Sequence, residues 1–137
     1  MLPPVFVDRL TTTGVGATVL RSPTEDDWRL EMQLSRDPDV ARWTVIPADL
    51  TEEQARARVQ RRLSAVAVGS LGFWIIEHEG APVGSVGAGL SGPDVEIFYA
   101  LLPSARGKGF ASAAVAAVVE SLKSRDCRLT LATYPDN

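Results

Sequence analysis

The residues best suited to chemistry form a short stretch, 106–111, which reads Arg-Gly-Lys-Gly-Phe-Ala. It follows an apolar run typical of a buried strand and precedes an alanine-rich stretch with helical spacing. The first N–H groups of a helix have no partner within the helix, and glycines let a ligand approach the main chain closely. Arg106 and Lys108 add positive charge, so the loop could bind an anion such as a pyrophosphate. Taken alone, the pattern is also compatible with a flexible turn carrying solvated charges.

The elements around this loop can be expected from periodicity, capping residues and turn residues. We expect a strand at 17–20, paired with Phe6-Val7 across the Thr-Gly-rich segment 11–16. Three helices follow, at 22–34, 37–43 and 51–66, and then a hairpin of strands 73–77 and 83–90. The remaining elements are a strand at 95–102, a helix at 110–123 and a last strand at 128–134. The arginines after Thr51 are interpreted as a solvated helix face.

This order indicates an α/β (α+β) fold, a mixed and mostly antiparallel sheet flanked by helices. The last strand can run parallel to its predecessor through the helical crossover. With 137 residues, 45% of them hydrophobic and 23% charged, the chain fits a single domain over 1–137.

Composition argues against several classes of partner. A formal net charge of −3 gives no broad cationic surface, so we expect no nucleic-acid partner. The longest apolar run, 113–119, is too short for a membrane span, and the N-terminus does not resemble a signal peptide. The single Cys127 is interpreted as a small buried hydrophobe and favours a reducing, cytoplasmic setting. No metal site is expected.

In combination, the segments resemble the GNAT superfamily of N-acetyltransferases. Its pyrophosphate loop, Arg/Gln-x-x-Gly-x-Gly/Ala, is matched at 106–111. The chain is most similar to the subgroup that includes ribosomal-protein N-terminal acetyltransferases, through 20–26, 37–43, 80–85 and 96–99. The resemblance spans about Thr18 to Asn137.

The resemblance implies acetyl-CoA as co-substrate and transfer of the acetyl group to a primary amine by direct attack. In the family, the strand before the loop splays from its neighbour and its backbone pairs with the pantetheine arm. The cofactor-binding residues implied here are Phe98, Ala100, Leu101, Leu102, Arg106, Gly107, Lys108, Gly109, Phe110 and Ala111. N–H groups near Leu101 would polarise the thioester carbonyl.

The resemblance also implies a base and acceptor contacts. Glu96 occupies the place of a glutamate that takes a proton from the amine, usually through water. The alternative is that Glu96 faces solvent or pairs with an arginine. Trp43 and Ile46 are candidate substrate contacts, although residues of these types are commonly core residues.

Family members continue after the position of Asn137 with a helix and a strand, and that helix often supplies a tyrosine that protonates the thiolate. Tyr99 and Tyr134 do not occupy that motif position. The sequence therefore predicts a C-terminally incomplete GNAT domain: a shortened piece, a domain completed by a homodimer or another partner, or a natural remnant. A remnant would be an inactive CoA-binding or protein-interaction module.

Overall fold

The computed structural model describes residues 6–123 and 128–131. Its elements, in chain order, are β1 (Leu10–Thr11), β2 (Thr18–Arg21), η1 (Glu25–Asp27), α1 (Trp28–Ser35), α2 (Pro38–Trp43), α3 (Glu52–Ala67), β3 (Leu71–His78), β4 (Ala81–Ser91), β5 (Asp94–Leu101), η2 (Pro103–Ala105), α4 (Phe110–Leu122) and β6 (Arg128–Leu131). The expected mixed α/β architecture is confirmed. Cys127 and the expected continuation of the last strand through 132–134 lie outside the described residues.

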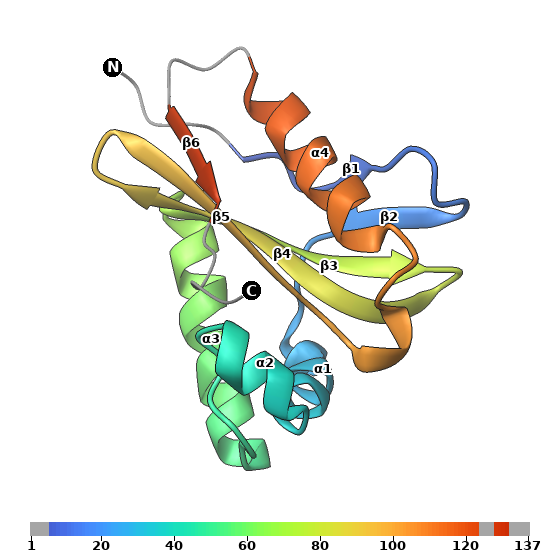
Figure 1. Cartoon of the computed structure of the whole chain (residues 1–137). Coiled ribbons are helices and arrows are strands. Elements are labelled where there is room, and N and C mark those ends of the chain that lie inside the picture. The colour runs from blue at the N-terminus through green and yellow to red at the C-terminus, as the bar shows by residue number, and fades with distance from the viewer. Residues whose placement is uncertain (1–5, 124–127, 132–137) are drawn as a thin grey trace.

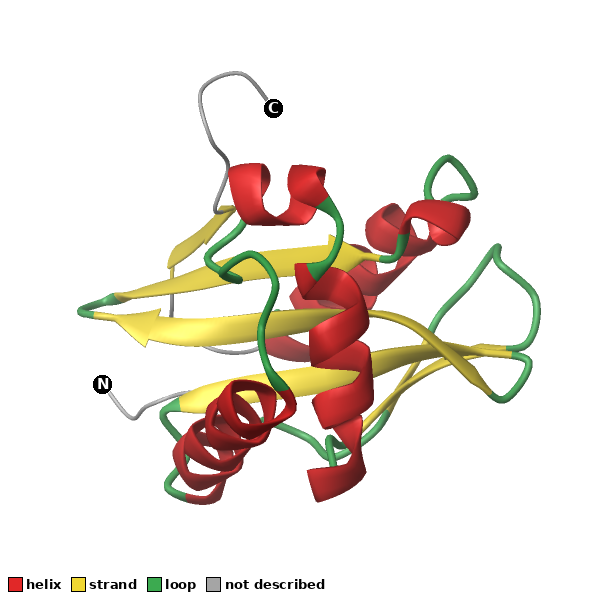
Figure 2. Ribbon diagram, turned by 90° about the horizontal axis from the view of Figure 1, so that it is seen from below, coloured by secondary structure: helices red, strands yellow, loops and turns green. Residues whose placement is uncertain are grey.

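The six strands form one sheet in the order β1-β2-β3-β4-β5-β6. Neighbours are antiparallel except β5 and β6, which are parallel and joined through α4. In Figure 1, α4 covers one face of the sheet and α1–α3 cover the other. Figure 2 shows the strands crossing the molecule with helices packed against them.

Each face of the sheet has its own apolar core because side chains alternate along a strand. Trp74 and Ile76 of β3 pack with α4, whereas Phe73 and Ile75 pack with α1–α3. This burial on both faces explains why β3 is apolar at every position from Phe73 to Ile76.

Local signals in the sequence set the helix starts. Thr51 accepts a hydrogen bond from the N–H of Gln54, and the Gln54 side chain accepts one from the N–H of Thr51; together these two bonds form a capping box at the start of α3. Asp37 caps α2, with Pro38 in the first turn.

Two expectations were wrong. Besides β3, β2 pairs with Leu10–Thr11 and not with Phe6-Val7. Phe6 and Val7 instead cover Trp74: the ring centres of Phe6 and Trp74 lie 6.2 Å apart in an edge-on arrangement, and the Val7 carbonyl accepts a hydrogen bond from the indole N–H at 2.9 Å. A buried indole N–H needs such an acceptor.

The arginines of α3 are also not all solvated. Arg58 and Arg62 bind the buried Glu31 carboxylate of α1 at 2.9 and 3.0 Å. A carboxylate that is only 2% exposed requires charged partners, and those partners come from the facing helix.

Candidate functional site: two adjoining cavities at the end of β5

The loop between η2 and α4 presents free N–H groups to one side of the fold. Gly107 and Gly109 have φ angles of 75° and 87°, in the left-handed region that favours glycine, and Gly109 is the N-cap of α4. No side chain of a described residue caps this helix. Among the described residues, no carbonyl accepts from the N–H groups of 107–109. N–H groups in this position, at the start of a helix, are suited to binding an anion.

Part of the outer edge of β5, the strand before the loop, pairs with no strand among the described residues. Within the described residues, β6 pairs with β5 only from Asp94 to Ile97, so the remainder of β5 is paired through β4 alone. The N–H of Leu102 donates to Val83 of β4 at 2.9 Å. Since hydrogen-bonded pairs alternate in an antiparallel ladder, the main-chain groups of Phe98 and Ala100 also point to β4.

The backbone N–H and C=O groups of Tyr99 and Leu101 therefore point away from β4. The position of Arg106 agrees, because its Nη2 donates to the Leu101 carbonyl at 3.3 Å. Tyr99 was not among the residues expected from sequence. The alternation of strand backbone groups could have identified it, once the pairing with β4 was known.

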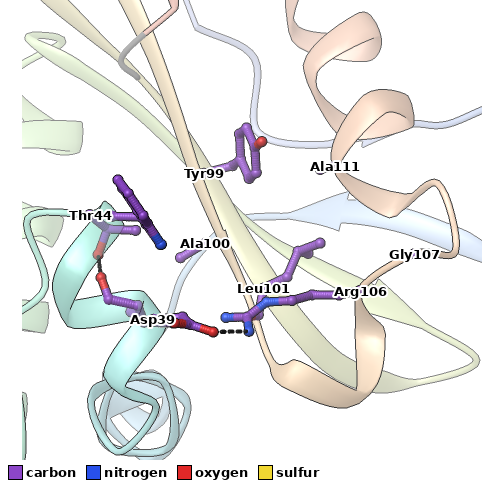
Figure 3. A pocket seen from close by; sticks show the side chains of 10 residues that line it. Asp39, Thr44, Tyr99, Ala100, Leu101, Arg106, Gly107 and Ala111 are labelled. Atoms are coloured by element: carbon purple, nitrogen blue, oxygen red, sulfur yellow. Dashed lines mark hydrogen bonds and ion pairs between the residues drawn. The ribbon is translucent and has the colours of Figure 1, made fainter. Parts of the chain in front are cut away.

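A cavity of about 420 Å³, here called the loop cavity, lies between α2, the end of β5 and the loop. Figure 3 shows the Arg106 side chain extending from the loop past Leu101 toward Asp39 of α2. Of the expected cofactor residues, this cavity brings together Ala100, Leu101, Arg106, Gly107 and Ala111. Sequence reasoning missed four further lining residues, Asp39, Val40, Thr44 and Tyr99.

A second cavity of about 180 Å³, the sheet cavity, adjoins the first. It brings together Glu96, Trp43 and Ile46, the residues expected to act as base and acceptor contacts, with Phe98 and Ala100 beside them. Ile46 belongs equally to the core under α1–α3. Ser85, missed from sequence, also lines this cavity: it is 6% exposed, and no described residue hydrogen-bonds its hydroxyl.

Two charged side chains line the sheet cavity, Arg62 and Glu96. The Arg62 guanidinium lies 4.0 Å from the centre of the Phe73 ring and binds Glu31. Burial acts to raise the pKa of Glu31, but the hydrogen bonds and charges of Arg62 and then Arg58 outweigh burial and lower it. Glu96 is exposed and forms no ion pair with a described residue, so it is the unpaired charge lining this cavity.

The remaining expected residues frame the loop. Lys108 is exposed and has no ion pair among the residues the structure covers, whereas Phe110 is buried against the sheet and packs 4.8 Å from the ring of His78. Leu102 marks the end of β5, where its N–H bonds to β4. No described helix is long and apolar enough to cross a membrane. In the same residues, no cluster of three or more His, Cys, Asp or Glu side chains is arranged to hold a metal ion.

This combination of sheet, glycine loop and α4 defines a class of acetyltransferase. A family model described as the acetyltransferase (GNAT) domain matches residues 18–137. The chain belongs to this family. A search of curated protein sequences gives no significant match.

Solved structures agree on the fold. RimJ from Mycobacterium smegmatis, in complex with CoA-disulfide, aligns with a TM-score of 0.80 at 19% identity, over 99% of this chain and 72% of that one. RimL, a ribosomal L7/L12 alpha-N-protein acetyltransferase in complex with coenzyme A, aligns with a TM-score of 0.79 at 20% identity, over 93% of this chain and 77% of that one. The microcin C7 self-immunity acetyltransferase MccE, in complex with acetyl-CoA and AMP, aligns with a TM-score of 0.78 at 13% identity, over 89% of this chain and 72% of that one.

Proposed function

We propose that this protein transfers an acetyl group from acetyl-CoA to a primary amine. The observation that carries the proposal is the meeting of the two cavities: Trp43, Thr44, Tyr99 and Ala100 line both. A ligand held by the loop and by the free edge of β5 would place its thioester at this junction. An amine in the sheet cavity would approach the same point from the other side.

The loop cavity suits acetyl-CoA by its chemistry. The N–H groups of 107–109 and the start of α4 would bind the pyrophosphate, with Lys108 adding a positive charge. The main-chain groups of Tyr99 and Leu101 would pair with the amides of the pantetheine arm, as an added strand would. RimL and RimJ, which share this fold, are complexed with coenzyme A and with CoA-disulfide respectively.

The sheet cavity suits an amine. Its arginine shares the Glu31 carboxylate with Arg58, whereas the Glu96 carboxylate has no ion-pair partner among the described residues and is available to an amine. Apolar walls from Trp43 and Ile46 favour the neutral, nucleophilic form of the amine.

In the proposed reaction, the amine nitrogen forms a bond to the thioester carbonyl carbon while the carbonyl oxygen gains negative charge. The outward N–H group of Tyr99, a residue that lines the junction, stabilises that oxygen. The C–S bond then breaks, and the electron pair leaves on the CoA thiolate, which takes a proton from solvent. Glu96, directly or through a water molecule, accepts the proton that the amine loses.

Replacing Glu96 with glutamine is expected to lower turnover by about 100-fold, because an amide cannot accept that proton. Acetyl-CoA affinity should be unchanged, since Glu96 lines only the sheet cavity. The measurement is release of free thiol from acetyl-CoA with saturating amine. Glu53→Gln, an exposed glutamate on α3, is the matched control. Undiminished turnover in Glu96→Gln would contradict the role of Glu96.

The proposal as a whole is tested with three acceptors: a peptide with a free N-terminus, a polyamine and an aminoglycoside antibiotic. We expect thiol release that depends on one of these amines, together with an acetylated product seen by mass spectrometry. A chain that binds acetyl-CoA but releases no thiol with any amine would instead be a CoA-binding module.

A further inference from the structure

Arg106 does not lie free at the loop cavity. Its guanidinium is ion-paired with Asp37, and its Nη1 is 3.7 Å from Asp39 Oδ2. The same group donates to the Leu101 carbonyl. One arginine therefore connects three segments: the loop, the end of β5 and the start of α2.

Asp37 is well placed to hold this arginine. Its side chain is 10% exposed, and its two oxygens have separate partners. Oδ1 accepts the N–H of Asp39 as the cap of α2, and Oδ2 binds Arg106. The capping hydrogen bond fixes the orientation of the Asp37 carboxylate, so its second oxygen is held toward Arg106, which is 69 positions away in sequence.

Two aspartates offset the single arginine, so this cluster has a formal charge of −1. An arginine in that position contributes little positive charge to a bound phosphate. The cation without a counter-ion at the loop, among the described residues, is Lys108.

The connection also reaches the acceptor side. α2 carries Asp37 at its start and Trp43 at its end, and Trp43 lines both cavities. Among the described residues, Arg106 makes all the hydrogen bonds and ion pairs between 37–44 and 102–111.

We infer that Asp37 is a positioning residue for acetyl-CoA: through Arg106 it fastens the glycine loop to α2 and to the end of β5, and Arg106 acts as the fastener of the loop and not as a phosphate ligand. This inference rests on the proposed function.

The two possible roles of Arg106 predict opposite signs for Asp37→Asn. If Asp37 fastens the loop, the variant loosens it, and acetyl-CoA binding weakens by roughly 5- to 10-fold as a charge-assisted hydrogen bond becomes a neutral one. If Asp37 instead competes with the phosphates for Arg106, the variant frees the arginine and binding tightens. Asparagine keeps the capping oxygen, so α2 should still form.

The experiment is calorimetric titration of acetyl-CoA into the wild-type chain, Asp37→Asn, Arg106→Gln and the double variant, with thermal unfolding of each. The inference predicts that Asp37→Asn and Arg106→Gln weaken binding to a similar extent. In the Arg106→Gln background, Asp37→Asn should add less than a twofold loss. A merely structural role of Asp37 in capping α2 would give additive losses instead.

Asp94→Asn is the matched control, because Asp94 forms an Asp–Arg pair with Arg128 at 2.8 Å and lines neither cavity. It should change affinity less than twofold. Unchanged or tighter binding by Asp37→Asn, or additive losses in the double variant, would overturn the inference. Absence of binding by the wild-type chain would instead contradict the proposed function.

Discussion

Replacing Gly109 with valine is expected to weaken acetyl-CoA binding by about 10- to 100-fold. Gly109 caps α4 with a φ of 87°, and a β-branched residue is strongly disfavoured there. The loop would relax to a different backbone, and its N–H groups would no longer converge on the pyrophosphate. Each lost hydrogen bond to a charged group is worth about 1.5–3 kcal/mol, or about one to two powers of ten in affinity.

The control for this variant is Gly69→Val. Gly69 has a similar φ of 81° with no atom near the position of a side chain, and it lies between α3 and β3, away from both cavities. Both variants should lose a similar amount of stability, about 1–2 kcal/mol, but Gly69→Val should keep its affinity in calorimetric titration. Equal affinities for the two variants would mean that the loop N–H groups do not bind the cofactor.

Replacing Glu31 with glutamine is expected to lower the free energy of unfolding by about 3 kcal/mol at pH 7. The substitution leaves Arg58 and Arg62 beside a neutral amide in a largely buried site. The arginines keep some contact with water, which places the loss at the lower end of the range for buried pairs. Urea unfolding followed by circular dichroism measures the difference.

The same residue gives a dependence on pH. Because the folded protein holds the pKa of Glu31 below its ordinary value of 4.5, the carboxylate stabilises the fold fully above that pH. The contribution is lost as pH falls through the lowered pKa, so wild-type stability should drop in acid by an amount that Glu31→Gln lacks. Glu52→Gln, which breaks an exposed pair with Arg56, should cost less than about 0.5 kcal/mol. Parallel acid profiles of wild type and Glu31→Gln would contradict this account.

Much of the fold could be predicted because its signals are local. The capping box at Thr51, the proline after Asp37 and the glycine-punctuated loop each act within a few residues. The pattern of apolar residues likewise predicted β3, β4 and β5 and the parallel crossover to β6.

The errors concern partners that are distant in sequence. The sequence around Phe6 and Val7 does not show that they pack against and hydrogen-bond the Trp74 indole. The sequence around Arg58 of α3 likewise does not show that it binds Glu31 of α1. The pair between Asp37 and Arg106 is of the same kind. Such contacts depend on tertiary packing, which residue types and spacing do not encode.

The candidate site was predicted in part. The loop was identified because glycines before a helix have a physical reason to bind anions. The outward direction of Tyr99 and Leu101 depends on the hydrogen-bonding register with β4, which is fixed only when Leu102 meets Val83. The position of Ser85 in the site also becomes visible only when the sheet cavity is formed.

The most direct test of the central claim is calorimetric titration of the wild-type chain with acetyl-CoA. We predict saturable binding at one site per chain, weakened by Lys108→Ala and by increasing salt, because the loop binds phosphate. A folded chain that shows no binding, or binding that is unaffected by Lys108→Ala and by salt, would contradict the assignment of the loop as the cofactor site.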